Sequence, residues 1–152
     1  MSIKRITNPV EFDKVIDDLH PLFLEEDKVG GHQLLSHSPE CIKKAFAHTS
    51  ILTWDIFVWA NKTGETFDAV IIFQNDKNVK FGEKIFHEFL WISRNSNAGY
   101  KLFKTAVKFA RENGFKTMVM GTVVKNPKHE KIKSFYEKMG FLKDSEAYIC
   151  KL

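Results

Sequence analysis

The middle of the chain constrains the fold most, because three consecutive segments have the composition of strands and are joined by short connections. They read SILTWDIFVWANKTGE (50–65), TFDAVIIFQNDKN (66–78) and KIFHEFLWIS (84–93), and β-branched and aromatic residues dominate all three. Turns are predicted at Lys62-Thr63-Gly64 and near Asp76-Lys77-Asn78. Connections this short join antiparallel neighbours, so these segments predict a meander.

Two helices are predicted before the meander. Asn8 is a candidate N-cap, and Pro9 suits a first helical position. The apolar stripe expected for this helix consists of Val10, Phe12, Val15, Ile16 and Leu19. Residues 20–38 are expected to form an irregular loop or a broken helix, and Ser38-Pro39-Glu40 should cap a second helix through about His48.

The last third of the chain alternates between helix and strand patterns. Helical spacing follows Gly99 and stops at Asn113-Gly114, FKTMVMGTVV (115–124) has the composition of a buried strand, and a last helix is expected over about 128–139 with Gly140 after it. With short strands at 3–6 and 148–152, the order is β-α-α-β-β-β-α-β-α-β. This order predicts an α/β (α+β) fold: a single domain, 1–152, whose mixed, mostly antiparallel sheet is flanked by helices.

Charge is distributed unevenly along the chain. Residues 1–100 hold 11 Lys and Arg against 14 Asp and Glu, a net of −3, whereas residues 101–152 hold 12 against 5, a net of +7. A basic C-terminal third suits an anionic ligand, either a nucleic acid or a phosphorylated cofactor, although solvated faces of two helices also explain most of these lysines. No segment has the length of a membrane span, and the two distant cysteines are expected to be thiols in a reducing cytoplasm.

A short polar loop precedes the helix that begins near Gly99. Backbone N–H groups at a helix N-terminus and the helix dipole both favour an anion. Arg94 can pair with a phosphate, and Asn97 and Gly99 tolerate positive φ angles. Many such loops bind nothing, so the loop by itself indicates only a possible anion site.

The loop and the segment FYEKMGF (135–141) together support a more specific prediction than the loop alone. The stretch from Arg94 to Phe141 resembles the GNAT superfamily of acetyl-CoA-dependent N-acetyltransferases, whose loop reads Gln/Arg-x-x-Gly-x-Gly/Ala. The helix ending in ARENGF and the late helix with FYEKMGF are also similar to the family's. The resemblance implies a GNAT-like fold, acetyl-CoA as co-substrate and no metal. The cofactor-binding residues that it implies are Phe89, Leu90, Trp91, Arg94, Asn95, Ser96, Asn97, Ala98, Gly99, Tyr100 and Asn126.

The resemblance also implies catalytic roles. Tyr136 stands where the family has the acid that protonates the leaving thiolate, and Ile132, Phe135 and Met139 share its helix face. A core tyrosine with a satisfied hydroxyl is the plainer alternative. Glu88 is the expected base, with Glu83 and His87 as rivals. The resulting activity is transfer of an acetyl group to a primary amine of a small molecule or protein.

Two departures from the family pattern bear on the site. Asn97 stands where the family usually has glycine, and His129 stands where many members have an asparagine, with Asn126 slightly upstream. Binding of CoA, a protein or tRNA without small-molecule turnover therefore remains an alternative function. A homodimer is possible, since folds of this family often dimerise.

The N-terminal third holds the residues that could attract an acceptor. Its acidic residues Asp17, Asp18, Glu25, Glu26 and Asp27 could attract a cationic amine, but we favour the plainer interpretation of a solvated charge run. The histidines of this region, His20, His32, His37 and His48, match no metal spacing and are expected to be exposed or capping residues.

Overall fold

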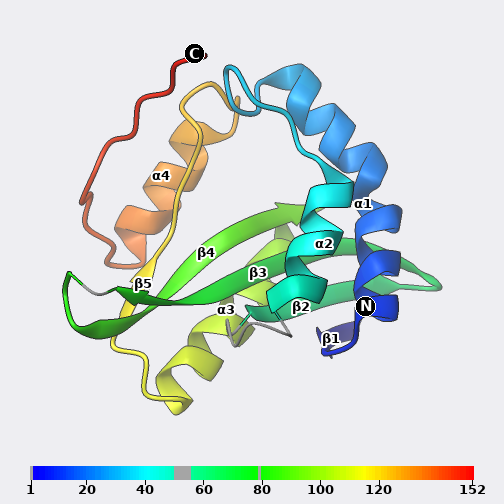
Figure 1. The fold of residues 1–152 in the computed structure, drawn as a ribbon, viewed down its shortest axis with the longest axis horizontal. Coiled ribbons are helices and arrows are strands. Elements are labelled where there is room, and N and C mark those ends of the chain that lie inside the picture. The colour runs from blue at the N-terminus through cyan, green and yellow to red at the C-terminus, as the bar shows by residue number, and fades with distance from the viewer. Residues whose placement is uncertain (1, 50–55, 79) are drawn as a thin grey trace. The chain divides into compact units, whose positions relative to one another are not determined.

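The computed structural model describes residues 2–49, 56–78 and 80–152. Residues 50–55, which begin the first predicted segment of the meander, lie outside the described residues. Figure 1 shows the elements in chain order. They are β1 Ser2–Ile6, α1 Pro9–Val29, α2 Pro39–Thr49, β2 Ile56–Thr63, β3 Thr66–Asn78, β4 Glu83–Ser93, α3 Ser96–Glu112, β5 Thr117–Val119 and α4 His129–Lys138.

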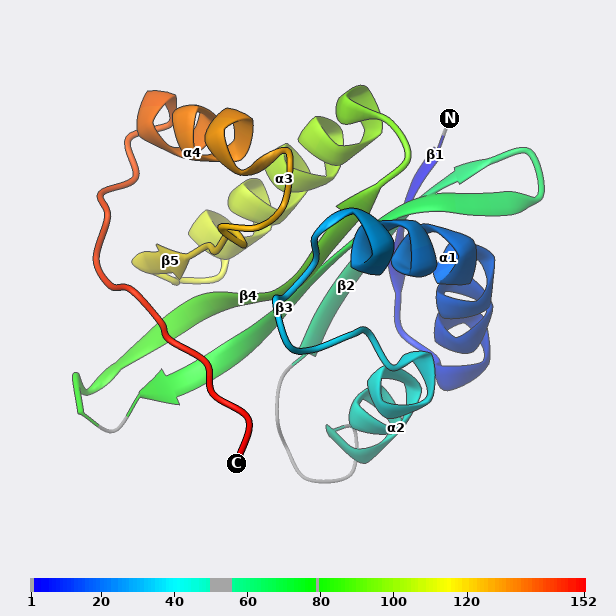
Figure 2. The same cartoon turned by 90° about the horizontal axis from the view of Figure 1, so that it is seen from above.

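The strands form one five-stranded sheet in the order β1-β2-β3-β4-β5. The first four strands are antiparallel neighbours, and β5 pairs with β4 in parallel. The meander predicted from the sequence is therefore confirmed, and so is the mixed, mostly antiparallel sheet flanked by helices. Figure 2 shows α2 and α3 on opposite sides of this sheet.

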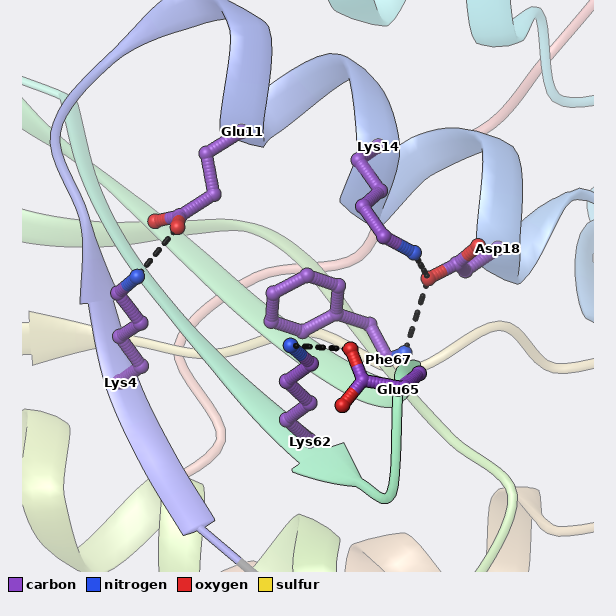
Figure 3. A network of polar contacts seen from close by, with 7 residues as sticks. All are labelled: Lys4, Glu11, Lys14, Asp18, Lys62, Glu65 and Phe67. Atoms are coloured by element: carbon purple, nitrogen blue, oxygen red, sulfur yellow. Dashed lines mark hydrogen bonds and ion pairs between the residues drawn. The ribbon is translucent and has the colours of Figure 1, made fainter.

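The start of α1 is fixed by its cap and by ion pairs. The Asn8 side chain accepts a hydrogen bond from the Glu11 N–H at 2.8 Å, which confirms the predicted N-cap. Two turns further along α1, Asp18 accepts from the Phe67 N–H at 3.0 Å and pairs with Lys14 (Figure 3). These contacts hold α1 against the β2–β3 hairpin.

The face of the sheet under α3 is an aromatic cluster. Phe57 of β2 lies 5.6 Å from Phe86 of β4 and 5.0 Å from Phe109 of α3, measured between ring centroids. The Arg5 guanidinium of β1 lies 4.6 Å from the Phe109 centroid, within cation–π range. These contacts attach the C-terminal half of α3 to β1, β2 and β4.

Four details of the sequence prediction were wrong. Val10 is 82% exposed and does not belong to the apolar stripe. The helix α1 continues through Val29, where a loop or broken helix was expected, because Leu22 and Phe23 extend the buried face past Pro21. The turn after β3 lies at 80–82 rather than 76–78, since β3 continues through Asn78.

The fourth error concerns strands near the C-terminus. The predicted buried strand over 115–124 is reduced to β5, and residues 141–152 contain no strand. Leu142 and Tyr148 are 91% and 92% exposed. Strand composition alone does not form a strand, which needs a neighbour to pair with.

Contacts between Cα atoms divide the chain into two compact units. The first contains Met1–Leu22 and Ser38–Met120, and the second contains Phe23–His37 and Gly121–Leu152. The whole sheet, α2 and α3 lie in the first unit, whereas α4 lies in the second.

Candidate active site

The N-terminus of α3 is capped by Asn95. Its backbone is extended, with φ −138° and ψ 147°, and its side chain accepts from the Ala98 N–H at 2.7 Å. The first turn of α3 contains no acidic residue, and Arg94, Ser96 and Asn97 are exposed around it. The positive end of the helix dipole therefore faces solvent without a neutralising carboxylate, which is the arrangement that an anion needs.

The backbone of this loop differs from the one expected. Asn97 and Gly99 both lie inside α3, so neither needs a positive φ angle. Asn97 fits because any L-residue adopts helical angles in a first turn, and its side chain is exposed. At Gly99 the space is limited instead, since an added Cβ would lie 3.2 Å from the Ser93 Cβ, closer than ordinary van der Waals contact.

The neighbouring residues complete the loop. Ala98 and Gly99 are buried against the end of β4, whereas Tyr100 is 41% exposed and lies 5.6 Å from the Lys104 Nζ, measured to its ring centroid. The Arg94 N–H donates to the Asp68 carbonyl at 3.0 Å. The loop is thus fixed to β3 through its backbone, and the Arg94 side chain remains exposed to meet an anion.

A β-bulge interrupts β4 just before this loop. Phe73 of β3 pairs with Glu88, and the preceding residue Ile72 pairs with Leu90, so Phe89 is an extra residue in β4. The extra residue reverses the alternation of the strand. Trp91 therefore points to the α3 face, where its ring stacks on Phe103 at 5.7 Å.

The parallel ladder between β4 and β5 is short. It contains the pairs from Ile85–Thr117 to His87–Val119, and β4 continues six residues beyond it to Ser93. The bulge at Phe89 lies in this continuation. Main-chain groups of Phe89, Leu90 and Trp91 thus lie where β4 has left β5, as an extended ligand arm would require.

The three candidate bases lie in different surroundings. Glu83 is exposed at the start of β4 and accepts from the Thr117 hydroxyl at 2.8 Å, so it joins β4 to β5. The His87 Nδ1 lies 3.4 Å from the Asp76 carboxylate, and both side chains are about 40% exposed. The strand register places Glu88 on the same face of the sheet as Phe73, and α3 covers this face.

Tyr136 lies in the second unit and is buried, as its place on the apolar face predicts. It is 9% exposed, and its ring centroid is 5.5 Å from that of Phe141. Its hydroxyl donates to the Gly121 carbonyl at 2.7 Å. The helix ends as predicted, with Gly140 at φ +88°. The hydroxyl is thus held in one orientation beside a backbone carbonyl.

Asn126 fixes the start of α4. Its Oδ1 accepts from the Lys128 N–H at 2.8 Å, and its Nδ2 donates to Glu26 Oε2 at 2.7 Å. Lys128 Nζ lies 3.5 Å from the other oxygen of Glu26. These bonds join the end of α1 to the start of α4 within the second unit, so Asn126 has a structural role whether or not it contacts a ligand.

The acidic residues of the N-terminal third are mostly occupied. Asp17 accepts from Lys43 at 2.5 Å, and this hydrogen bond raises the pKa of the lysine above its ordinary value. Asp18 accepts a hydrogen bond from the Phe67 N–H, and Glu26 accepts one from the Asn126 amide. The Asp27 carboxylate bonds to the His37 ring. The run therefore serves mainly internal pairing rather than an open acidic rim.

Comparison with known proteins gave matches only among solved structures: no family model and no curated protein matches the chain. A ribosomal-protein-alanine N-acetyltransferase from Brucella melitensis biovar Abortus 2308 covers all of this chain and is itself fully covered, at 10% identity and TM-score 0.67. An aminoglycoside acetyltransferase from an uncultured soil metagenomic sample, solved with sisomicin, covers 99% of this chain, which covers 96% of it, at 10% identity and TM-score 0.68.

A third structure, a "predicted acetyltransferase" from Clostridium acetobutylicum solved with acetyl-CoA, has 9% identity and TM-score 0.67, with 99% of this chain and 95% of that one covered. The chain shares the fold of these three structures, a GNAT-like fold. At these identities the likeness establishes the architecture alone. It confirms the fold that the loop after β4 and the FYEKMGF helix indicated.

Two features of this GNAT-like chain were missed in the sequence. The bulge at Phe89 leaves no signal in a run of apolar residues. The pairing of Asp27 with His37 joins residues ten apart across a loop, so no periodicity marks it. The described residues contain no group of three or more potential metal ligands, and among them we find no helix long and apolar enough to cross a membrane.

Proposed function

We propose that the protein is an acetyl-CoA-dependent N-acetyltransferase that acts on a primary amine of a small molecule or a protein. The observation that carries the proposal is the exposed, acid-free N-terminus of α3 directly after the bulged end of β4, in a fold shared with acetyltransferases. One end of this arrangement suits a pyrophosphate and the other an extended arm.

The proposed ligand-binding roles are as follows. Arg94 and the residues around the start of α3, from Asn95 to Tyr100, are proposed to hold the pyrophosphate. Main-chain groups of 89–91 hold the arm and polarise the acetyl carbonyl. Asn126 is proposed as a further ligand contact beside its structural role.

Two side chains are proposed to move protons. Tyr136 donates its hydroxyl proton to the leaving thiolate. Glu88 takes the proton that the amine nitrogen still carries after it has attacked the thioester. Exposed free thiols at Cys41 and Cys150 suit a reducing compartment, and we place the reaction in the cytoplasm.

Calorimetric titration with acetyl-CoA tests the site. The proposal predicts binding, and Arg94→Ala should weaken it about 10- to 100-fold, because a charged hydrogen bond to phosphate contributes about 1.5–3 kcal/mol. Arg111→Ala is the matched control, since it removes the same charge from the far end of the same helix. Equal affinities of the two variants would contradict the loop assignment.

Transfer is tested by CoA release with a panel of amines: sisomicin, spermidine and a peptide with an N-terminal alanine. Turnover of any of them supports the enzymatic proposal. Binding of acetyl-CoA without turnover on the panel would favour the alternative, a GNAT-fold protein that binds CoA or a protein or tRNA partner.

A further inference from the structure

Asp68 is an extra residue in β3, close to the turn of the β2–β3 hairpin. Asn61 of β2 pairs with Ala69. The next residue of β2, Lys62, pairs with Phe67, which leaves Asp68 without a register partner in β2. A residue of this kind forms a β-bulge, where the ladder of backbone hydrogen bonds is interrupted. The ladder with β2 therefore does not fix the backbone of Asp68.

The side chain of Asp68 bonds to β2 in place of the ladder. Its Oδ1 accepts from the Asn61 Nδ2 at 2.7 Å, and its Oδ2 accepts from the Thr63 hydroxyl at 2.8 Å. Both carboxylate oxygens are thus bonded to side chains of the neighbouring strand. Asp68 is tied to β2 through its carboxylate, where a regular strand residue would be tied through its backbone.

The burial of Asn61 shows that this network costs stability. Among the described residues, Asn61 is the only polar one with an exposed fraction of 0%. Its Oδ1 has no hydrogen-bond donor within the described parts of the chain. A buried amide with an unpaired oxygen is destabilising relative to an apolar side chain of similar shape. The contact that Asn61 provides in return is the bond from its Nδ2 to Asp68.

The backbone of Asp68 holds Arg94. The Asp68 carbonyl accepts from the Arg94 N–H at 3.0 Å, one residue beyond the end of β4, and the Arg94 side chain is exposed. The same residue therefore bonds to β2 through its carboxylate and to Arg94 through its carbonyl. Release of the carboxylate would free the peptide group that fixes the backbone of Arg94. All of these residues lie in the first compact unit.

The position of Arg94 matters because the loop offers an anion few other donors. Four backbone N–H groups between 94 and 99 already donate to protein acceptors: those of Arg94, Asn95, Ala98 and Gly99. No described residue accepts from the other two, Ser96 and Asn97. Arg94 is also the one charged side chain from 94 to 99. The affinity of the loop for a phosphate therefore depends on where this guanidinium lies.

We propose that Asp68 is a positioning residue for acetyl-CoA binding: held by Asn61 and Thr63, it fixes the backbone of Arg94 so that the guanidinium meets the pyrophosphate. This inference rests on the function proposed above. The carboxylate of Asp68 would itself repel a phosphate. Removal of this charge alone would strengthen anion binding, whereas loss of positioning weakens it. The sign of the effect thus separates the two.

Calorimetric titration with acetyl-CoA tests this role. Asp68→Ala should weaken binding about 10-fold, the lower end of the loss expected for Arg94→Ala, because the guanidinium is displaced rather than removed. Asp68→Asn should bind at least as tightly as the wild-type protein. Its amide oxygen accepts from Asn61, and the Thr63 hydroxyl can accept from its Nδ2.

Glu65→Ala is the matched control. It removes the same charge from the turn of the same hairpin, where Glu65 is 97% exposed and lies 3.5 Å from the Lys62 Nζ (Figure 3). We expect no change in the affinity for acetyl-CoA. If Asp68→Ala does not fold, Thr63→Val replaces it, since it removes one of the two carboxylate bonds at an exposed position. It should weaken binding about threefold, and Thr63→Ser should restore the affinity.

A double-mutant cycle tests whether Asp68 acts through Arg94. Arg94→Ala keeps the backbone bond to Asp68 but lacks the guanidinium, so Asp68→Ala should weaken binding less than about twofold in that background. Independent effects would multiply instead. In the free protein, amide hydrogen exchange at Arg94 should quicken in Asp68→Ala, while the amides of β4 keep their protection.

Each result supports or overturns the proposal. The positioning role is overturned if wild-type protein binds acetyl-CoA and Asp68→Ala, or Thr63→Val in its place, binds equally well or more tightly. A loss that persists in full without the Arg94 guanidinium also overturns it, as does an equal loss in Asp68→Asn. These results leave the acetyltransferase proposal standing. No binding of acetyl-CoA to the wild-type protein overturns the proposed function and this inference with it.

Discussion

Gly30 occupies a position that no other residue should fill, and its replacement tests the contacts of the second unit. Its φ angle is +121°, and an added Cβ would lie 2.3 Å from the Lys125 carbonyl oxygen and 3.1 Å from the carbonyl carbon. Both neighbours are backbone atoms, so neither can turn away as a side chain would. Gly30→Ala must therefore combine a strained backbone with a steric overlap.

The expected loss of stability follows from these two terms. A non-glycine residue in such a region costs about 1–3 kcal/mol, and relief of the overlap costs a similar amount. Together they give about 3 kcal/mol or more, which corresponds to a lowering of Tm by roughly 6–12 °C in a chain of this size. Gly64→Ala is the control, because its φ is +62° and nothing lies within 4 Å of the added Cβ. It should cost only about 1–2 kcal/mol, the cost of a left-handed backbone for an L-residue.

Thermal unfolding and amide hydrogen exchange measure the effect. Exchange should quicken first in α4 and in residues 23–37, while the amides of β2, β3 and β4 keep their protection. If Gly30→Ala and Gly64→Ala lose equal stability, the contact between Gly30 and Lys125 is not a constraint in solution. Uniform loss of protection over the whole chain would refute the expected localisation.

Substitutions at three further positions have definite expected outcomes. Tyr136→Phe should lower kcat with little change in acetyl-CoA affinity and cost about 1 kcal/mol of stability, because the bond to the Gly121 carbonyl is lost; unchanged kcat would remove the hydroxyl from the mechanism. Asn95→Ala should cost about 1 kcal/mol by removing the cap of α3, and Asn95→Asp should recover most of it in chemical denaturation. Asn61→Ala should cost about 1–3 kcal/mol, since the buried amide bonds to Asp68 at 2.7 Å; a stability equal to wild type would show that water replaces it.

Local patterns predicted much of the fold. Strand-rich segments with short turns predicted the meander, helical spacing predicted α3, and Asn8 and Gly140 predicted where helices begin and end. Each of these patterns depends only on residues that are close together in the sequence. The sequence also located the loop after β4, because a short polar stretch of small residues separates a strand pattern from a helix pattern there.

What the sequence did not predict depends on contacts between distant residues. The bulge at Phe89 is set by the register with β3, and one apolar residue looks like another in that run. The orientation of His37 depends on Asp27 across a loop. The pattern of 148–152 favoured a strand, but pairing needs a neighbour, and the structure shows these residues without strand geometry. The roles of Glu88 and Tyr136 stay predictions.

Strand β4 continues beyond the residues that pair with β5, and this affects how far related sequences can diverge. Recognition through main-chain groups depends on the path of the backbone, and every residue except proline supplies the same N–H and C=O. Phe89 and Trp91 can therefore be exchanged for other side chains as long as the bulge and the strand direction persist. The proposed site, built in this way, would permit sequences to drift far apart while the architecture is retained. The three structures compared above share the fold at 9–10% identity.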